Sequence, residues 1–322
     1  MPAAAECRTI ATDFSNSTVI LDLEHRGRAG YLAGCLLDCG HGIALLDPGP
    51  SATLEVLRRK LHDRGLAISD ITTVLLTHIH LDHAGGVGSL VEENPDIQVF
   101  VHQRGAAHLM DPKRLLESAS RALGQSAESY WGSVTPLPAR NVKVLTGGES
   151  IALGARNFEV LYTPGHASHH ISFFEARSGV AFVGDAAGIR IGNSFVYPAT
   201  PPPDIDLASL DQSLDLILAR EPQRLLLTHF GLLGRVEWHM AEFRDRLRRW
   251  SEFVLASLQR PGEDAERAAA FSKMVMEELR SVAAEEEAAW FDKLTSSRQN
   301  WFGLARYWRR RLSSSSEESM AI

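Results

Sequence analysis

Cysteine is scarce in this sequence, which holds only Cys7, Cys35 and Cys39 among its 322 residues. Cys35 and Cys39 lie four residues apart in a stretch typical of a strand, where the strand rise would separate them by roughly 13 Å, too far for a disulfide bond. The low and odd number of cysteines is not typical of a secreted protein stabilised by disulfides. We therefore expect reduced thiols and a cytoplasmic location.

Two further absences concern membranes and nucleic acids. No stretch is long and apolar enough to span a membrane, and the first residues, MPAAAECRTIATDFS, lack the apolar core of a signal peptide. Basic residues are not in excess, because 33 Lys and Arg stand against 40 Asp and Glu and the net charge is −7. The sequence thus predicts no membrane contact. It also argues against a uniformly basic nucleic-acid surface, although not against a local basic groove.

What the chain does contain, up to about residue 233, is an alternation of short apolar runs with helical patterns. The apolar runs are residues 31–37, 43–46, 74–76, 99–101, 158–161, 171–174, 180–183 and 225–227. Leucines with helical spacing fall between them, for example Leu54, Leu57 and Leu61. Short continuous runs indicate buried strands, and the repeated alternation predicts an α/β protein built in layers.

After Gly234 the apolar residues follow helical spacing alone. They form three stripes, namely Phe243, Leu247, Trp250 and Val254, then Phe271, Met274, Val275, Leu279 and Val282, then Trp301, Leu304, Trp308 and Leu312. We interpret residues 1–233 as the layered domain and 234–322 as a helical C-terminal region that ends in a disordered segment, SSSSEESMAI. Because no flexible linker separates the two, we expect the helices to pack beside the layered domain. A homodimer contact is an additional arrangement.

The segment LLTHIHLDHAGG, residues 75–86, concentrates metal-binding side chains. Its His78, His80, Asp82 and His83 directly follow a buried run and precede small residues at which a helix can begin, which places them on a loop at a strand end. Loop residues there can converge on one point, and imidazole and carboxylate groups are ligands of zinc and iron. The alternative is a solvated polar loop, but four such groups rarely lie so close together without a metal ion.

Three more polar residues end apolar runs elsewhere in the chain. His166 occurs in TPGHASHH, Asp185 in GDAAG and His229 in THFG. Open α/β sheets collect their ligands at strand ends, so these residues are candidates to complete a metal site together with the histidine segment.

In this order, the motifs THIHLDHAGG, TPGHASHH, GDAAG and THFG resemble those of the metallo-β-lactamase fold superfamily of metal-dependent hydrolases. The resemblance covers roughly residues 17–232 and implies a four-layer αβ/βα sandwich in which two mixed sheets carry the metals along one edge. It also implies the ligands, which are His78, His80 and His166 for a first metal ion, Asp82, His83 and His229 for a second, and Asp185 as the bridge. No ligand position of the family is lost, which favours a working two-metal centre over a degenerate scaffold.

A two-metal centre of this kind indicates a hydrolytic mechanism. Two divalent cations per chain, zinc foremost with iron or manganese as alternatives, would acidify a bridging water and stabilise the oxyanion that forms when the resulting hydroxide attacks. The resemblance implies that Asp82 also acts catalytically, by accepting the proton of that hydroxide. A serine or cysteine nucleophile is then not required, and the sequence has no G-x-S-x-G motif.

Two residues are candidates to support the ligands from behind. Asp47, in LLDPG, would hold a ligand histidine or the ligand loop by hydrogen bonds. The alternative is a turn aspartate that caps its own loop. His170 matches a second histidine that follows the ligand of this motif in relatives, so we interpret it as buried support.

Candidate substrate contacts come from two loops. Residues 109–140 form an insertion of the kind that relatives use as a lid over the metals, and its Tyr130 and Trp131 would contact an apolar part of a substrate or pack against the C-terminal helices. Arg190 and Tyr197, in the loop after Asp185, would reach the mouth of the pocket or serve only as scaffold.

The leading functional hypothesis is a hydrolase of a small-molecule thioester, ester or lactone. The layered core followed by helices is similar to glyoxalase II, but the glutathione-binding residues of that family are not found in register, so its substrate is not transferred. Phosphodiester or nucleic-acid hydrolysis would need a basic groove or an extra insertion, and neither is evident. A persulfide dioxygenase with one iron is a further alternative, since such enzymes keep similar motifs.

Overall fold

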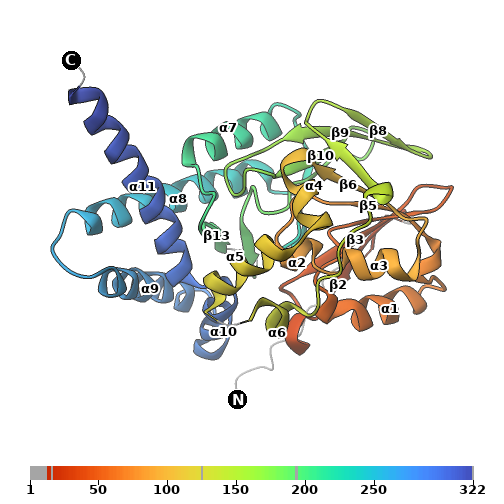
Figure 1. Cartoon of the computed structure of the whole chain (residues 1–322), viewed down its shortest axis with the longest axis horizontal. Coiled ribbons are helices and arrows are strands. Elements are labelled where there is room, and N and C mark those ends of the chain that lie inside the picture. The colour runs from red at the N-terminus through yellow and green to blue at the C-terminus, as the bar shows by residue number, and fades with distance from the viewer. Residues whose placement is uncertain (1–12, 16, 125, 193–194, 321–322) are drawn as a thin grey trace.

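The computed structural model describes residues 13–15, 17–124, 126–192 and 195–320, and it contains two facing β-sheets with helices outside them (Figure 1). The first sheet has seven strands in chain order, which are β1 (Asp13–Ser15), β2 (Thr18–Asp22), β3 (Ala33–Asp38), β4 (Ile43–Leu46), β5 (Ile71–Leu75), β6 (Gln98–His102) and β7 (Val142–Leu145). Neighbours are antiparallel from β1 to β4 and parallel from β4 to β7. The sheet is therefore mixed.

The second sheet has six strands and is also mixed. Its spatial order is β15 (Gly231–Leu233), β14 (Arg224–Leu227), β11 (Val180–Phe182), β10 (Ile171–Glu175), β9 (Arg156–Tyr162) and β8 (Ser150–Leu153). Only β11 and β14 run parallel. A separate hairpin of β12 (Ile189–Ile191) and β13 (Phe195–Tyr197) follows β11 in the chain.

Successive side chains along a strand point to opposite faces of its sheet, and this divides the core into layers. Cys35 and Leu37 of β3 face the second sheet, where they pack with Phe158 and Phe173, whereas Leu36 faces the other way. Strands buried on both faces read as continuous apolar runs, which explains why the sequence shows no polar alternation in them. The thiols of Cys35 and Cys39 are buried and form no disulfide bond, and Cys7 lies outside the described residues.

Helices cover the outer faces of the sheets. The helices of the layered domain are α1 (Leu54–His62), α2 (Leu81–Ala84), α3 (Val87–Glu93), α4 (Gln103–Met110), α5 (Lys113–Leu123), α6 (Ala127–Trp131) and α7 (Leu207–Leu218). The helices α1 and α3 lie along the first sheet, and α7 lies against the second (Figure 1). The predicted fold class, an αβ/βα sandwich of two mixed sheets with C-terminal helices, is confirmed.

Four helices make up the C-terminal region, namely α8 (Val236–Leu258), α9 (Asp264–Arg280), α10 (Glu285–Thr295) and α11 (Ser297–Met320). Trp250, Phe271 and Trp301 are fully buried among them and join the same hydrophobic core as the layered domain. The prediction of a disordered end over residues 313–322 is wrong as far as Met320, because α11 continues to that residue with no glycine or proline after Gly303 to end it, and residues 321–322 lie outside the described residues. Among the described residues, no helix combines the length and the apolarity needed to cross a membrane.

Candidate metal centre

The candidate ligands come from four loops that leave strands at the same edge of the sandwich. The loop after β5 carries His78 and His80, and the short helix α2 that follows it turns Asp82 and His83 toward the same point. His166, Asp185 and His229 follow β9, β11 and β14, respectively. The backbone N–H of Ile171 donates to the carbonyl of Thr77 at 2.8 Å and fixes the two sheets together beside the site.

The structure brings all seven predicted ligands together. Their donor atoms fall into three groups, each within 4.8 Å, which are His78, His80 and His166, then Asp82, His83 and His229, then His78, His83 and Asp185. His80 Nδ1 lies 2.9 Å from His78 Nε2 and 3.0 Å from His166 Nε2. The first two groups coincide with the two metal sites implied by the sequence, and Asp185 lies between them.

Asp185 contacts ligands of both groups. One of its carboxylate oxygens lies 3.3 Å from His83 Nε2 and 3.7 Å from His229 Nε2, and the other lies 3.5 Å from His166 Nε2. Among the described residues, neither His83 Nε2 nor Asp185 Oδ1 has a hydrogen-bond partner although both are buried. Buried polar atoms are normally paired, so converging unpaired nitrogen and oxygen donors fit divalent metal ions.

Backbone carbonyls orient two of the imidazole rings. His229 Nδ1 lies 2.8 Å from the carbonyl oxygen of Tyr31, and His166 Nδ1 lies 2.9 Å from that of Ala199. A carbonyl can only accept, so each Nδ1 carries the proton and each Nε2 presents its lone pair to the centre.

Asp47 connects the ligand loops from behind. Its Oδ2 accepts from Thr77 Oγ1 at 2.7 Å and from Thr228 Oγ1 at 2.7 Å, and it lies 2.8 Å from His83 Nδ1. Its Oδ1 accepts from the Thr77 backbone N–H at 2.9 Å. The side chain is fully buried, so this carboxylate holds both a ligand histidine and two ligand loops rather than capping its own turn.

His170 supports the backbone of Asp185. Its ring is fully buried, its Nδ1 lies 2.9 Å from Thr163 Oγ1, and its Nε2 accepts from the backbone N–H of Asp185 at 3.3 Å. The neighbouring His169 is also buried, with its Nδ1 3.5 Å from the backbone nitrogen of Ile79. Both histidines therefore lie behind the ligand loops.

Burial and neighbouring charges shift the pKa values of the candidate ligands. Burial lowers the pKa of His78 well below its ordinary value and that of His80 to about 4, so both rings are neutral. Burial alone would raise the pKa of the Asp82 and Asp185 carboxyl groups, but His83 and His229 outweigh it and lower both pKa values. Burial alone would lower the pKa of His83 and His229, but nearby carboxylates, Asp185 foremost, outweigh it and raise both pKa values. The centre thus offers neutral imidazoles at His78 and His80, ionised carboxylates at Asp82 and Asp185, and two imidazoles that would give up a proton when a metal ion binds.

A cavity of about 580 Å³ opens above these ligands. His80, Asp82, His166, Asp185 and His229 form its floor, as part of the lining. Its walls come from the 109–140 insertion, through α5 and α6, and from residues 293–300 at the junction of α10 and α11. This volume suits a small molecule.

Of the four candidate substrate contacts, Tyr130 and Trp131 line this cavity, and the ring of Trp131 stacks on His25 with centroids 4.9 Å apart. Arg190 and Tyr197 do not line it. Because β12 and β13 form a hairpin, alternation turns Ile189 into the cavity and Arg190 away from it. Tyr197 is fully buried against Trp250, and its hydroxyl accepts from Asn300 Nδ2 at 2.8 Å, so its predicted place at the mouth is wrong.

Sequence reasoning missed two sets of cavity residues. Tyr31 lines the cavity with its ring centroid 4.7 Å from that of His229, but in the sequence it only begins an apolar run. The residues at the α10–α11 junction reach the cavity through tertiary packing, for which no local signal exists.

Known proteins resemble this chain in sequence and in fold. A family model described as the metallo-beta-lactamase superfamily matches residues 36–229, more than half of the chain. A metallo-beta-lactamase fold-containing protein of Sulfurisphaera tokodaii is 33% identical over 164 residues, which cover 50% of this chain and 61% of that protein. A hydroxyacylglutathione hydrolase of Legionella pneumophila is 29% identical over 150 residues, which cover 47% of this chain and 42% of that protein. The chain thus spans less than two thirds of the length of these relatives.

A solved structure extends the likeness to the C-terminal helices. The crystal structure of a metallo-beta-lactamase family protein of Thermus thermophilus matches with a TM-score of 0.70 at 22% identity, covering 93% of this chain and 95% of that chain. At this identity the likeness concerns the fold, and its coverage includes most of the helical region. From the family match together with the ligand geometry, we conclude that the chain belongs to the metallo-beta-lactamase superfamily.

Proposed function

We propose that this superfamily hydrolase binds two divalent metal ions, zinc foremost, and cleaves a small-molecule thioester, ester or lactone. The observation that carries the proposal is the complete set of buried ligands beneath a cavity of about 580 Å³. The likeness to a hydroxyacylglutathione hydrolase, whose name denotes a thioester substrate, supports the choice of acyl chemistry. A cytoplasmic location agrees with the two free thiols.

The bound metals would supply Lewis acidity toward water and toward the scissile carbonyl. The residues of the chain provide the remaining functions. His78, His80 and His166 would hold one cation, Asp82, His83 and His229 the other, and Asp185 would contact both. Asp82 lines the cavity with its side chain 19% exposed, whereas that of Asp185 is 5% exposed. Asp82 is therefore the carboxylate placed to accept a proton from the attacking water.

The walls would exclude bulk water from the reaction. Tyr130 and Trp131 close one side and Leu294 closes another, and each side chain is at least half-buried. A drier cavity strengthens the attraction between the metal centre and an oxyanion.

A substrate panel tests this proposal. Protein purified without chelators is assayed with S-acyl thioesters, aryl esters, lactones and bis-p-nitrophenyl phosphate, and oxygen uptake is followed with a persulfide. We expect acyl substrates to be hydrolysed and Asp82→Asn to lower kcat by roughly 100-fold. Cleavage of the phosphodiester alone, oxygen uptake with the persulfide alone, or an acyl-enzyme trapped by mass spectrometry would overturn the proposal.

A further inference from the structure

The cavity has two chemically different ends. At the floor, the ligands are buried, with His166 2%, Asp185 5% and His229 1% exposed. The lining residues Arg121, Lys293 and Arg298, in contrast, are all exposed. The difference in solvent exposure therefore places the candidate metal centre at the inner end of the cavity and the three cations at its opening. These three residues are called the basic rim below.

The basic rim has no counterions in the part of the chain that the structure describes. No ion pair joins its members to a carboxylate, and the only acidic residues among the described cavity lining are the ligands Asp82 and Asp185. Seven other arginines of the C-terminal region are ion-paired, namely Arg244, Arg246, Arg248, Arg249, Arg267, Arg280 and Arg309, whereas Arg235, Arg260 and Arg306 have no ion pair among the described residues. The basic rim thus places three cations without a counterion at one opening of a chain whose net charge is −7.

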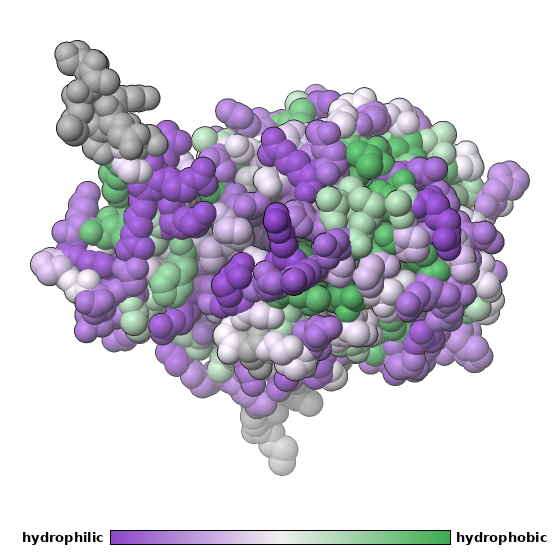
Figure 2. Space-filling model, in the orientation of Figure 1, coloured by the Kyte–Doolittle hydropathy of each residue, from purple (hydrophilic) through white to green (hydrophobic). Residues whose placement is uncertain are grey.

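Specific contacts bring the basic rim together from two parts of the chain. The side-chain amide of Gln299 donates to the carbonyl of Ala122 at 2.6 Å and joins α11 to α5. Arg298 and Arg121 are the immediate chain neighbours of these two residues. On the third side, Leu294 packs, as Leu115 of α5 does, against the cluster of Leu81, Ala127, Tyr130 and Trp131, and its neighbour Lys293 lines the same cavity. Hydrophilic side chains accordingly lie over α5 in the middle of the face shown in Figure 2.

Apolar side chains separate the basic rim from the metal centre. The lining also includes Leu115, Ala119, Leu123 and Leu294, which are partly buried and so intermediate in exposure between the buried ligands and the exposed rim, and the buried Ile189. A ligand that spans the cavity would meet metals at one end, an apolar passage, and cations at the other. A carboxylate or a phosphate is the group that such cations bind, because charge-assisted hydrogen bonds from guanidinium and ammonium groups are strong.

We propose that the basic rim binds an anionic group, a carboxylate or a phosphate, on the substrate at the end remote from the scissile bond. This inference rests on the proposed function for the place of the scissile bond. It narrows the substrate to an acyl compound with an apolar segment and a terminal negative charge. Attraction at the opening would also raise the rate of association against the negative net charge of the chain.

Thiol probes test the basic rim without any turnover. The probes are ω-mercapto acids of increasing chain length, the matching ω-mercapto alcohols and the matching ω-mercaptoalkyl phosphates, whose thiolates would bind the metal centre of the zinc-loaded protein. Dissociation constants are measured by calorimetry. At one chain length or more we expect an anionic probe to bind at least about fivefold more tightly than its alcohol. The acid and phosphate series decide between a carboxylate and a phosphate.

Matched variants assign this preference to the basic rim. Arg121→Gln combined with Lys293→Met and Arg298→Gln should abolish it, and Lys293→Met alone should weaken it. The control is a triple variant that removes three exposed charges outside the cavity lining, Lys113→Met with Arg114→Gln and Lys273→Met. This variant should keep the preference for anionic probes. No anion preference at any length, or an equal loss in both triple variants, would overturn the proposal. A protein that binds the probes as expected but hydrolyses no acyl substrate would overturn only the proposed function.

Discussion

The carboxylate of Asp47 lies 2.8 Å from His83 on the side of the ring that faces away from the other ligands. Because a carboxylate accepts, His83 Nδ1 carries the proton and Nε2 is left without a partner among the described residues. The same carboxylate accepts from Thr77 and Thr228, so one residue orients ligands on loops that are far apart in the sequence.

Asp47→Asn should weaken zinc binding by roughly 10- to 100-fold, because an amide cannot accept all of these hydrogen bonds. Asparagine tolerates the left-handed backbone at this position, where φ is 46°, so the backbone is kept. Affinity is measured by competition with a chromophoric chelator. Asp38→Asn, at an exposed turn where Oδ1 accepts from Gly40, is the control and should bind zinc normally. Unchanged affinity in Asp47→Asn would contradict the role given to this residue.

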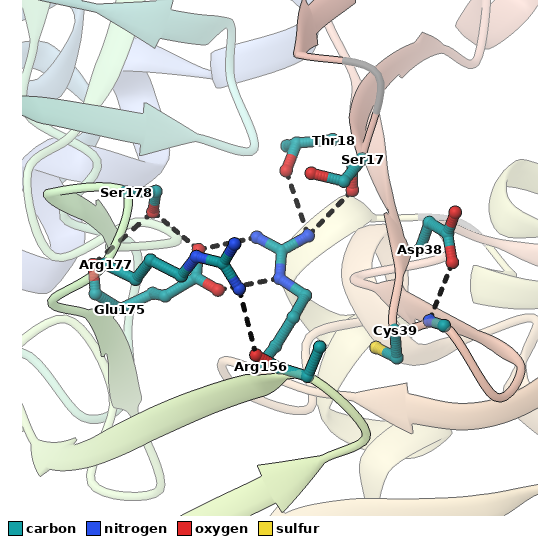
Figure 3. A pocket seen from close by; sticks show the side chains of 10 residues that line it. Ser17, Thr18, Asp38, Cys39, Arg156, Glu175, Arg177 and Ser178 are labelled. Carbon is teal, nitrogen blue, oxygen red and sulfur yellow. Dashed lines mark hydrogen bonds and ion pairs between the residues drawn. The ribbon is translucent and has the colours of Figure 1, made fainter.

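A buried ion pair braces the sheets at the opposite end of β9 from His166. Arg156 donates to both carboxylate oxygens of Glu175, at 2.7 and 2.6 Å, and also to the hydroxyl of Thr18, the first residue of β2 in the other sheet, and to the carbonyl of the preceding Ser17 (Figure 3). Glu175→Gln should therefore lower the free energy of unfolding by about 3 kcal/mol or more, because it leaves a buried guanidinium without its counterion. Urea unfolding measures this. Glu159→Gln, which breaks a pair with the partly exposed Arg220, should cost less than about 1 kcal/mol.

The same pair predicts a pH dependence. Burial raises the pKa of Glu175, but hydrogen bonds from Arg156 and Ser178 outweigh it, so the folded-state pKa is lowered below 4.5. The stability that this carboxylate contributes is then fully present above about pH 4.5 and is lost as the pH falls through the folded-state pKa. The stability difference between wild type and Glu175→Gln, measured in chelator, should be constant near neutral pH and shrink in acid. A difference that grows in acid would contradict this assignment.

Two leucines of α11 test whether the C-terminal helices share the core of the layered domain. Leu304 is fully buried, and Leu312 is 50% exposed. Leu304→Ala should lower the free energy of unfolding by about 2 to 5 kcal/mol, whereas Leu312→Ala should change it by less than about 0.5 kcal/mol. Both are read from one cooperative unfolding transition. If Leu304→Ala instead melted only a separate, earlier transition, the helices would be an independent unit.

The convergence of the seven candidate ligands could be predicted from sequence, because each follows an apolar run and the four motifs occur in the order of the family. The supporting role of Asp47 could be predicted from the sequence, but its hydrogen-bond partners could not, because they depend on how the fold brings Thr77 and Thr228 together. The positions of Arg190 and Tyr197 could not be predicted from the sequence, because the pairing of β12 with β13 determines which side chains face the cavity.

The basic rim could not be predicted from the sequence, because tertiary packing brings its residues together. Arg121 and Arg298 are far apart in the chain, and a hydrogen bond between their neighbours unites them. Helical periodicity identifies the buried stripes of the C-terminal region but not which helix junction meets the insertion. Cavity walls built by tertiary packing leave no local pattern.

The most direct test of the two-metal account is to count metal ions and measure acyl hydrolysis in wild type and Asp185→Asn, prepared in parallel without chelators. The amide keeps the shape of Asp185 and removes the charge that contacts His83, His166 and His229. We predict about two metal ions per chain in the wild type, with both metal content and kcat lower in the variant. An Asp185→Asn protein that keeps two metal ions and full activity would contradict the account.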